Sequence, residues 1–492
     1  MRRLALLIAA LLIAAPGEML TGTVVDASGQ PVEGARVRLR TSPSFVLTDA
    51  QGRFTLADPS TTPDAEITAA LPGHIIGGAI VKHGIRAYRI QLPPIPAGDD
   101  PTYPWVTAFP EDDQAPRTDF GREPCGACHR RALTEWQESA HARSATNPRF
   151  LAFLDGSRRL AAGKVNSEGC GTCHVPMAPD DDPRRLADVA KEGIGCDFCH
   201  KIVEARPGTG NVTGVRAVEL RRPPFGRQTV FGPFDDVPRG RDAFAPVFTE
   251  SRYCAACHQA RSGAGAIYSE FEEWQESRYV AAGITCQSCH MRGDGKATTM
   301  TELGPGRVAR NPATLSSHRF HDSRTPDLLG QAVETAMTAH RDGEALVVTV
   351  EITNRGAGHR LPAGSPLRHM LLSLNAETDG RPLAMIDGPT LPSWAGAGLR
   401  GKPGRAYAKL FLDPASPGHP SLPWADANAV TDTRIRAGER DRSTWRFRLG
   451  VPGETRVEAR LLVRRGFPEW AALLSIGTED IAVATQRATL RH

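Results

Sequence analysis

The alternation of apolar and polar positions divides the chain into three regions. Between residues 18 and 93, short segments such as 35–39 and 53–56 alternate apolar and polar side chains, and clusters of Gly, Asp and Ser separate them. Half-buried strands joined by turns have this pattern. We therefore predict a small antiparallel β-sandwich here. A proline-rich, acidic linker should follow at 94–116.

The strand pattern is absent from residues 117–328, where segment 133–141 has apolar residues at helical spacing and predicts a helix. Strand patterning returns in 329–492, for example at 346–353 and 457–463. A chain of 492 residues is long enough for several domains. The predicted fold class is multidomain, with a small N-terminal β-sandwich, a mainly α-helical and loop core, and a C-terminal β-sandwich-like domain.

The first 17 residues have the features of a secretory signal peptide. A basic start at Met1-Arg2-Arg3 precedes an apolar run over 4–15 and small residues suited to cleavage. A retained membrane anchor is the alternative interpretation. No later stretch reaches the ~18 apolar residues of a spanning helix. We therefore expect an exported chain, periplasmic or extracellular, with no spanning segment after cleavage.

The charge balance excludes one class of partner. The formal net charge is only +4, so the composition gives no reason to expect binding to nucleic acid or to a strongly anionic surface.

The cysteines carry the most specific signal in the sequence. All ten fall into five Cys-x-x-Cys pairs, and a histidine follows each pair directly. The five motifs are Cys125/Cys128/His129, Cys170/Cys173/His174, Cys196/Cys199/His200, Cys254/Cys257/His258 and Cys286/Cys289/His290.

This order of residues predicts covalent attachment of haem c. Two thiols add to the two vinyl groups of one haem as thioethers, and the next histidine ligates the iron. A disulfide scaffold or zinc ribbons would also use paired cysteines, but neither requires a histidine after each pair. We predict five haem c groups, with the motif cysteines as attachment sites and the motif histidines as proximal ligands.

A partial internal repeat lies in the haem region. Residues 135–139 (Glu-Trp-Gln-Glu-Ser) recur at 273–277, and each copy follows a haem motif. Downstream, Gly-Ile-Gly-Cys ending at Cys196 corresponds to Gly-Ile-Thr-Cys ending at Cys286. The two blocks are interpreted as diverged haem–helix–haem units, with the second haem motif inserted in the first copy.

Each iron needs a sixth ligand or remains open. His141 lies on the predicted helix after the first motif. His318 and His321 follow the last motif, and we favour His318. His359 lies in a glycine-rich loop that would let the backbone approach a flat ligand closely. These positions predict His141, His318 and His359 as distal ligands, with His340 and His369 as weaker candidates.

The histidine count leaves room for one open iron. Tyr279 occupies the position in the second repeat that His141 occupies in the first. The haem on Cys254/Cys257, or a neighbour, is therefore the candidate open site. A packing role for Tyr279 is the alternative.

Two resemblances accompany these patterns. The glycine and turn pattern from Gly22 through Gly34 to Gly52-Arg53-Phe54 resembles the carboxypeptidase regulatory-like domain, which implies a non-catalytic β-sandwich. Residues from about 100 to 480 resemble multihaem cytochromes of the c-552/c-554 type, through the segments at 125–141, 195–201 and 283–291 and through Gly358-His359.

The second resemblance implies a mostly helical core with closely stacked haems and a role in electron transfer. Related cytochrome c nitrite reductases and hydroxylamine oxidoreductases are enzymes, but this sequence has no Cys-x-x-Cys-Lys site. We expect an electron carrier that acts between redox partner proteins. Whether the chain also converts a substrate as an enzyme stays open. The alternatives are a reductase or oxidase of a small nitrogen or sulfur compound at one open iron, and a self-associating conducting assembly.

Overall fold

The structure is a computed structural model of the chain. The predicted signal peptide at 1–17 and part of the predicted linker lie outside the residues that it describes. The described residues are 19–57, 65–109, 124–160, 168–182, 185–207, 212–224, 228–262, 265–302, 307–322, 325–412, 419–421, 429–450, 452–474 and 476–491.

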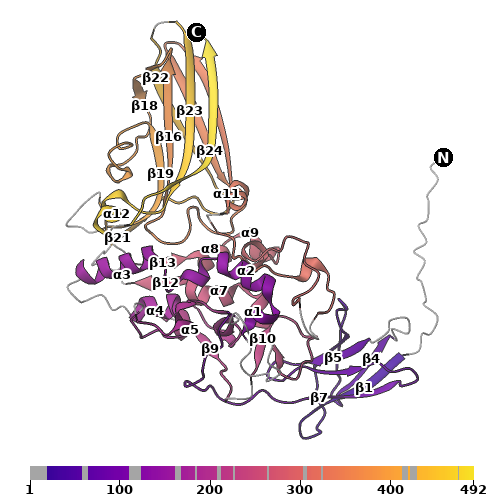
Figure 1. The fold of residues 1–492 in the computed structure, drawn as a ribbon. Helices are drawn as coiled ribbons and strands as arrows, with labels where there is room; N and C mark the ends of the chain where they lie inside the picture. The colour runs from indigo at the N-terminus through magenta and orange to yellow at the C-terminus, as the bar shows by residue number, and fades with distance from the viewer. Residues whose placement is uncertain are drawn as a thin grey trace, which may run out of the picture. The chain divides into compact units, whose positions relative to one another are not determined.

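The chain forms two compact units, and each is described by itself. The first contains Met1–Tyr103 together with two segments from later in the chain, Arg222–Pro246 and Ala309–Asn311. The second contains the remainder, with all five Cys-x-x-Cys-His motifs and the C-terminal strands. The predicted order of a β-rich, a helical and a second β-rich region is confirmed (Figure 1).

Two sheets share one apolar core in the first unit. Apolar side chains of both sheets, including Leu20, Val37, Ile67 and Ile90, are almost fully buried together, and each such burial contributes roughly 1.5–3 kcal/mol. One sheet has the order β4-β1-β7 and the other β3-β2-β5-β6. Their bounds are β1 Met19–Asp26, β2 Arg36–Leu39, β3 Val46–Leu47, β4 Arg53–Ala57, β5 Glu66–Ala70, β6 Gly77–Ile80 and β7 Ala87–Leu92.

The expectation of a wholly antiparallel arrangement in this unit is wrong at one strand pair. The first and last strands, β1 and β7, pair in parallel, from Thr21 opposite Ala87 to Asp26 opposite Leu92. Parallel neighbours need a long crossover. The chain provides it because the strands of the second sheet lie between β1 and β7 in sequence.

Ion pairs within the first unit join segments that are distant in sequence. Asp235 accepts a 2.7 Å bond from Arg38, and Asp236 accepts one of 2.7 Å from Arg310. Both carboxylates are almost fully buried. The described residues of 228–246, which also carry β10 (Val230–Gly232) and β11 (Asp242–Phe244), thus belong to the same unit as the N-terminal sheets, whereas the predicted boundaries place them in the haem domain.

The haem-motif region of the second unit consists of short helices and two-stranded sheets (Figure 1). The predicted helix over 133–141 ends earlier than expected, because α2 stops at Glu138 and His141 begins a separate 3-10 turn. The elements are α1 Cys125–Cys128, α2 Arg130–Glu138, η1 His141–Arg143, α3 Pro148–Leu160, α4 Glu168–His174, α5 Asp188–Lys191, α6 Cys196–Cys199, β8 Ile202–Ala205, η2 Gly214–Ala217, β9 Val218–Leu220, η3 Pro246–Thr249, α7 Ser251–His258, β12 Gln259–Ser262, β13 Gly265–Ser269, α8 Glu270–Gln275, α9 Arg278–Ala281, α10 Cys286–His290, η4 Pro312–Thr314 and α11 Pro326–Ala332.

The C-terminal part has two sheets around one core that includes Val348, Leu372, Trp445 and Val457. One sheet has the order β14-β15-β22-β18; the other runs β20-β19-β16-β23-β24, with β17 on β16 and β21 on β19. The elements are β14 Val333–Asp342, β15 Ala345–Asn354, β16 His369–Thr378, β17 Arg381–Pro382, β18 Met385–Asp387, η5 Ser393–Ala395, β19 Gly404–Leu412, β20 Pro420–Ser421, β21 Ala429–Asp432, β22 Arg440–Arg448, β23 Glu454–Arg464, α12 Pro468–Leu474 and β24 Asp480–Arg491.

None of the helices in the described part of the chain has the length and apolar character needed to span a membrane.

Candidate haem-binding site

Each Cys-x-x-Cys-His motif lies on or at the end of a short helix: α1, α4, α6, α7 and α10. Residues three apart lie on the same side of a helical turn, so the two thiols of a motif can reach one planar ligand. All ten cysteines are free thiols and half-buried. Free paired thiols fit haem attachment, whereas a disulfide scaffold would have joined them.

Thiols of different motifs approach one another. Cys196 lies next to Cys125, and this proximity, together with burial, raises the pKa of Cys196. Cys254 has the same relation to Cys286, and Cys257 to Cys173 of the second motif. The three contacts link the first motif to the third, the second to the fourth, and the fourth to the fifth.

Three motif histidines have their rings held by backbone carbonyls. Nδ1 of His129 lies 2.9 Å from the carbonyl oxygen of Met300, and Nδ1 of His174 lies 3.2 Å from that of Ser144. In His290 the distance to the oxygen of His321 is 2.6 Å. Because a carbonyl can only accept, Nδ1 carries the proton and Nε2 keeps its lone pair. Metal-ligating histidines typically have this arrangement.

The ring of His359 lies opposite that of His290. Their centres are 6.3 Å apart and their planes differ by 19°. An iron held between two imidazole nitrogens at about 2 Å each separates the ring centres by roughly 6 Å. Nδ1 of His359 donates to the carbonyl of Arg360 at 3.1 Å. Both rings therefore keep Nε2 available for one metal.

His141 has the same separation from a different motif histidine. Its ring centre lies 6.3 Å from that of His258, with planes 65° apart. Burial, followed by the charge of His258, lowers the pKa of His141 to about 3. The ring is therefore neutral near pH 7, as a metal-ligating imidazole must be. The predicted distal candidate after the first motif thus faces the fourth.

His318 is half-buried beside the first and third motifs. Burial, followed by the charges of His200 and then His129, lowers its pKa to about 3. Its Nδ1 is buried and has no hydrogen-bond partner among the described residues. A buried ring nitrogen without a hydrogen-bond partner fits a ring whose partner is a bound group and not another side chain.

The other candidates named from the sequence lie elsewhere. Nε2 of His321 is 3.2 Å from the carbonyl of Arg292. His369 is buried in the C-terminal part, stacked on Phe467, and burial lowers its pKa to about 4. His340 is exposed on β14. The hydroxyl of Tyr279 donates to the carbonyl of Arg355 at 3.3 Å, as a packing residue would.

The second motif has different surroundings. The ring of Phe150 stacks on that of His174, with the ring centres 4.1 Å apart and the planes 3° from parallel. Burial raises the pKa of Tyr268, as do the charges of Glu270, Cys173 and Cys170, while Arg368 acts in the opposite sense. Tyr268 therefore lies near this motif, and Arg368 lies near Tyr268. Sequence reasoning missed both, because neither belongs to a local pattern.

Comparisons with known proteins agree with this geometry. The family model for the carboxypeptidase regulatory-like domain matches residues 19–75, and that for cytochrome c554 and c-prime matches residues 124–201. The chain is a multihaem c-type cytochrome. The family match covers the first three of its haem motifs, and haem c is therefore its cofactor.

Two relatives extend the likeness of this multihaem cytochrome. It is 25% identical over 214 residues to the cytochrome c nitrite reductase subunit NrfA of Nitratidesulfovibrio vulgaris, over 39% of either chain. The matched part thus spans well under half of that relative. The crystal structure of a penta-heme cytochrome c552 from Thermochromatium tepidum aligns with a TM-score of 0.53 at 20% identity, covering 74% of this chain and 97% of that one. This second likeness concerns the fold.

Proposed function

We propose that this chain is an exported pentahaem c-type cytochrome that passes electrons through closely packed haems between redox partner proteins. The observation that carries the proposal is the set of thiol contacts that join Cys125 to Cys196, Cys173 to Cys257 and Cys254 to Cys286. Because the motif cysteines lie next to one another, the haems attached to them would also lie close together. Bound haem iron supplies one-electron chemistry, and the protein sets its potential through ligation and burial.

The proposed ligation uses the ten motif cysteines for attachment and the five motif histidines as proximal ligands. We assign His359 to the iron of His290 and His141 to that of His258, on their 6.3 Å separations. We assign His318 to the iron of His200. His200 is the histidine whose charge acts most strongly on His318, and the internal repeat supports the same pairing.

The proposal includes the layout of the chain. A signal peptide at 1–17 would direct export to the periplasm or cell surface. A β-sandwich at 18–93 and a linker at 94–116 would precede a pentahaem domain at 117–328 and a β-sandwich-like domain at 329–492. The two β-rich parts provide surfaces on which redox partners or further copies could dock.

The test combines haem counting with redox titration. Intact-protein mass spectrometry of the exported protein should give five covalent haems. A spectroelectrochemical titration should then show reversible reduction of all five. Fewer than five haems, with unmodified motif cysteines in the peptide map, would overturn the proposal.

The surroundings of His174 favour a second candidate function. A reductase or oxidase of a small nitrogen or sulfur compound needs one iron with an open face. Near the second motif, Phe150 stacks on His174, and Tyr268 with Arg368 provides a hydroxyl and a cation. The match to a nitrite reductase subunit supports the same class of substrate.

Electron paramagnetic resonance distinguishes the two candidates. For the carrier, the spectrum of the oxidised protein should not change when nitrite or hydroxylamine is added. For the enzyme, a stoichiometric high-spin signal should shift on addition, and Tyr268→Phe should reduce turnover with a reduced dye as electron donor. Sustained turnover without such a signal would exclude an open haem as its site.

A further inference from the structure

The internal repeat has the same hydrogen bonds in both copies. The indole Nε1 of Trp136 donates to the carbonyl of Ile194 at 2.9 Å. In the second copy, Nε1 of Trp274 donates to the carbonyl of Ile284, also at 2.9 Å. Each accepting isoleucine lies two residues before the first cysteine of a motif. In both copies, therefore, the helix that follows one haem motif is hydrogen-bonded to the residue just before another motif.

A second pair of bonds aligns the copies residue by residue. The amide of Ile194 donates to the carbonyl of His141, and that of Ile284 to the carbonyl of Tyr279. The glycines before both isoleucines, Gly193 and Gly283, have φ of +67°, a conformation that suits glycine. Residues in corresponding places in the two copies can therefore be compared directly.

The first glutamate of the repeated sequence binds a backbone amide in each copy. Oε2 of Glu135 accepts a 2.8 Å bond from the amide of His318. Oε2 of Glu273 accepts a 2.9 Å bond from the amide of Arg360, the residue after His359. Thus the same carboxylate, in two copies of one unit, holds the chain at or next to a proposed distal ligand.

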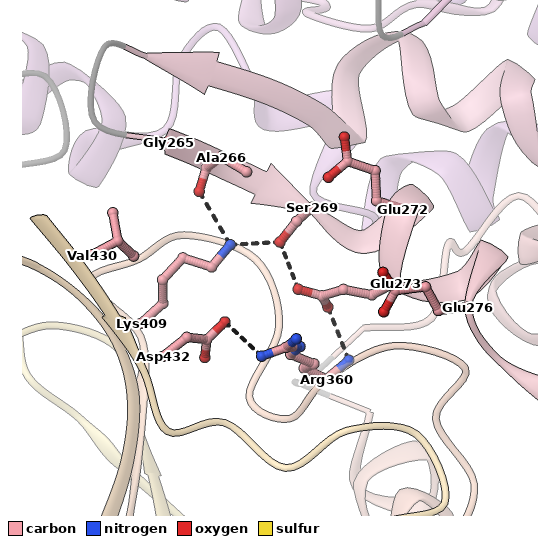
Figure 2. A pocket seen from close by; sticks show the side chains of 10 residues that line it. All are labelled: Gly265, Ala266, Ser269, Glu272, Glu273, Glu276, Arg360, Lys409, Val430 and Asp432. Atoms are coloured by element: carbon pink, nitrogen blue, oxygen red, sulfur yellow. Dashed lines mark hydrogen bonds and ion pairs between the residues drawn. The ribbon is translucent and has the colours of Figure 1, made fainter.

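Both carboxylates are buried and have a second partner. Glu135 is 7% exposed and pairs with Arg131 at 3.0 Å. Glu273 is 8% exposed. Its Oε1 accepts a 2.6 Å hydrogen bond from the hydroxyl of Ser269 and forms an ion pair with Arg434. Figure 2 shows Glu273 pointing between Ser269 and the amide of Arg360 at the edge of a pocket.

The charge state of Glu273 follows from these contacts. Burial raises the pKa of its carboxyl, but the charge of Arg434 and the bonds from Ser269 and the amide of Arg360 together outweigh burial. The pKa therefore lies below its ordinary value, and the group is ionised at neutral pH. Hydrogen bonds to charged acceptors are about twice as strong as neutral ones.

We propose that Glu135 and Glu273 are equivalent positioning residues, each of which fixes through one backbone amide the loop that brings a distal histidine to the second iron of its repeat. Glu135 would act on His318, and Glu273 on His359. The inference rests on the ligation put forward under the proposed function. Neither carboxylate contacts an iron; each would act through the loop and through its own negative charge.

The loop of His359 needs such a restraint. It contains Gly356 and Gly358 before the histidine and Gly364 after it, and glycines give a loop many conformations to lose on ordering. A bond to a charged acceptor contributes enough to change the ratio of bound to released histidine by a factor of roughly 10 to 100. Removal of the acceptor should therefore release the ligand measurably.

The repeat supplies its own control residues. Glu138 and Glu276 are the second glutamates of the same five-residue sequence, and both are exposed. Glu138 is 53% exposed where it pairs with Arg319. Solvent and salt screen exposed charges strongly. Glu276→Gln removes a charge just after α8, and Glu138→Gln removes one at the end of α2 together with its exposed ion pair to Arg319. Neither substitution affects a loop amide.

The experiment uses the full holoprotein with Glu273→Ala, Glu273→Gln, the matched pair at Glu135, the two controls and His359→Ala. Two readouts follow each variant: the spin states by paramagnetic resonance, and carbon monoxide binding to the reduced protein. Glutamine keeps an oxygen that can accept the amide but removes the charge. Alanine removes both.

We expect the alanine variants to gain one high-spin iron or one additional carbon monoxide site, whose affinity rises by a factor of roughly 10 to 100. The glutamine variants should stay low-spin, with the potential of one haem raised because a negative charge near it is lost. The controls should match the parent. If Glu273→Ala fails to load haem, Glu273→Gln and the Glu135 pair still provide the test.

Two results would overturn the inference in different ways. If His359→Ala converts one iron to high spin but the alanine and glutamine variants at Glu273 and Glu135 change neither spin state nor potential, the positioning role is wrong and the ligation stands. If His359→Ala itself leaves the low-spin count unchanged, the proposed ligation fails, and the inference fails with it.

Discussion

The ring planes of His290 and His359 lie 19° from parallel with their centres 6.3 Å apart. His141 and His258 have the same separation, but their planes are 65° apart. Nearly parallel imidazoles split the energies of the iron dπ orbitals, whereas nearly perpendicular ones leave them close. The two proposed irons should therefore differ in magnetic anisotropy although their ligands are identical.

This difference gives a prediction for the oxidised protein. His359→Ala should remove a rhombic low-spin signal, because the near-parallel pair splits the orbitals. His141→Ala should remove a different, strongly anisotropic signal. His340→Ala, which changes an exposed histidine on β14, should remove neither. Loss of the same signal in both ligand variants would contradict the two assignments.

The glycine inside the second motif should tolerate no side chain. A Cβ on Gly171 would lie 2.0 Å from the carbonyl oxygen of Pro179, whereas one on Gly169, in the same helix, would meet nothing within 4 Å. Overpacking typically costs about 1–3 kcal/mol, and here the obstacle is backbone. Gly171→Ala should lower the thermal midpoint or the haem count measured by mass, and Gly169→Ala should change neither.

Lys409 should make stability depend on alkaline pH. Burial, reinforced by the charge of Arg434, lowers its pKa from 10.5 to about 8. Between these values the unfolded chain binds more protons than the folded one, so the free energy of unfolding gains a contribution that rises with pH. Below the folded-state pKa that contribution is constant.

The measurement compares Lys409→Met with the parent by denaturant unfolding at about pH 7.5 and about pH 10. The parent should gain more, or lose less, stability between the two conditions than the variant. Lys402→Met, at an exposed position of the same β-rich part, is the control and should follow the parent. Parallel pH profiles for the parent and Lys409→Met would show that the burial of Lys409 has no such effect.

Local motifs allow attachment sites to be predicted from the sequence, because the two cysteines and the histidine lie close together in the chain whatever the fold. The internal repeat could also be recognised from the sequence, and the matching indole hydrogen bonds of Trp136 and Trp274 agree with it. What the repeat could not reveal is the partner of each distal histidine. His141 follows the first motif but faces His258 of the fourth, and only tertiary packing determines this.

The same limit explains the other differences. An open iron on Cys254/Cys257, or on a neighbour, stays a prediction. His141 lies opposite His258 of that motif and would close this iron under the proposed ligation, which leaves Tyr279 its alternative role in packing. Buried ion pairs such as Arg38 with Asp235 join residues 228–246 to the N-terminal sheets. Charged residues are common throughout this chain, so periodicity cannot identify which of them pair across almost two hundred positions.

The most direct test of the account is low-temperature paramagnetic resonance of the oxidised protein, with the haem count fixed by mass. The account predicts five covalent haems and low-spin signals that His141→Ala, His318→Ala and His359→Ala each reduce by one iron. If the count falls short of five, or if any of these substitutions leaves the low-spin signals intact, the proposed haem chain and its ligation are contradicted.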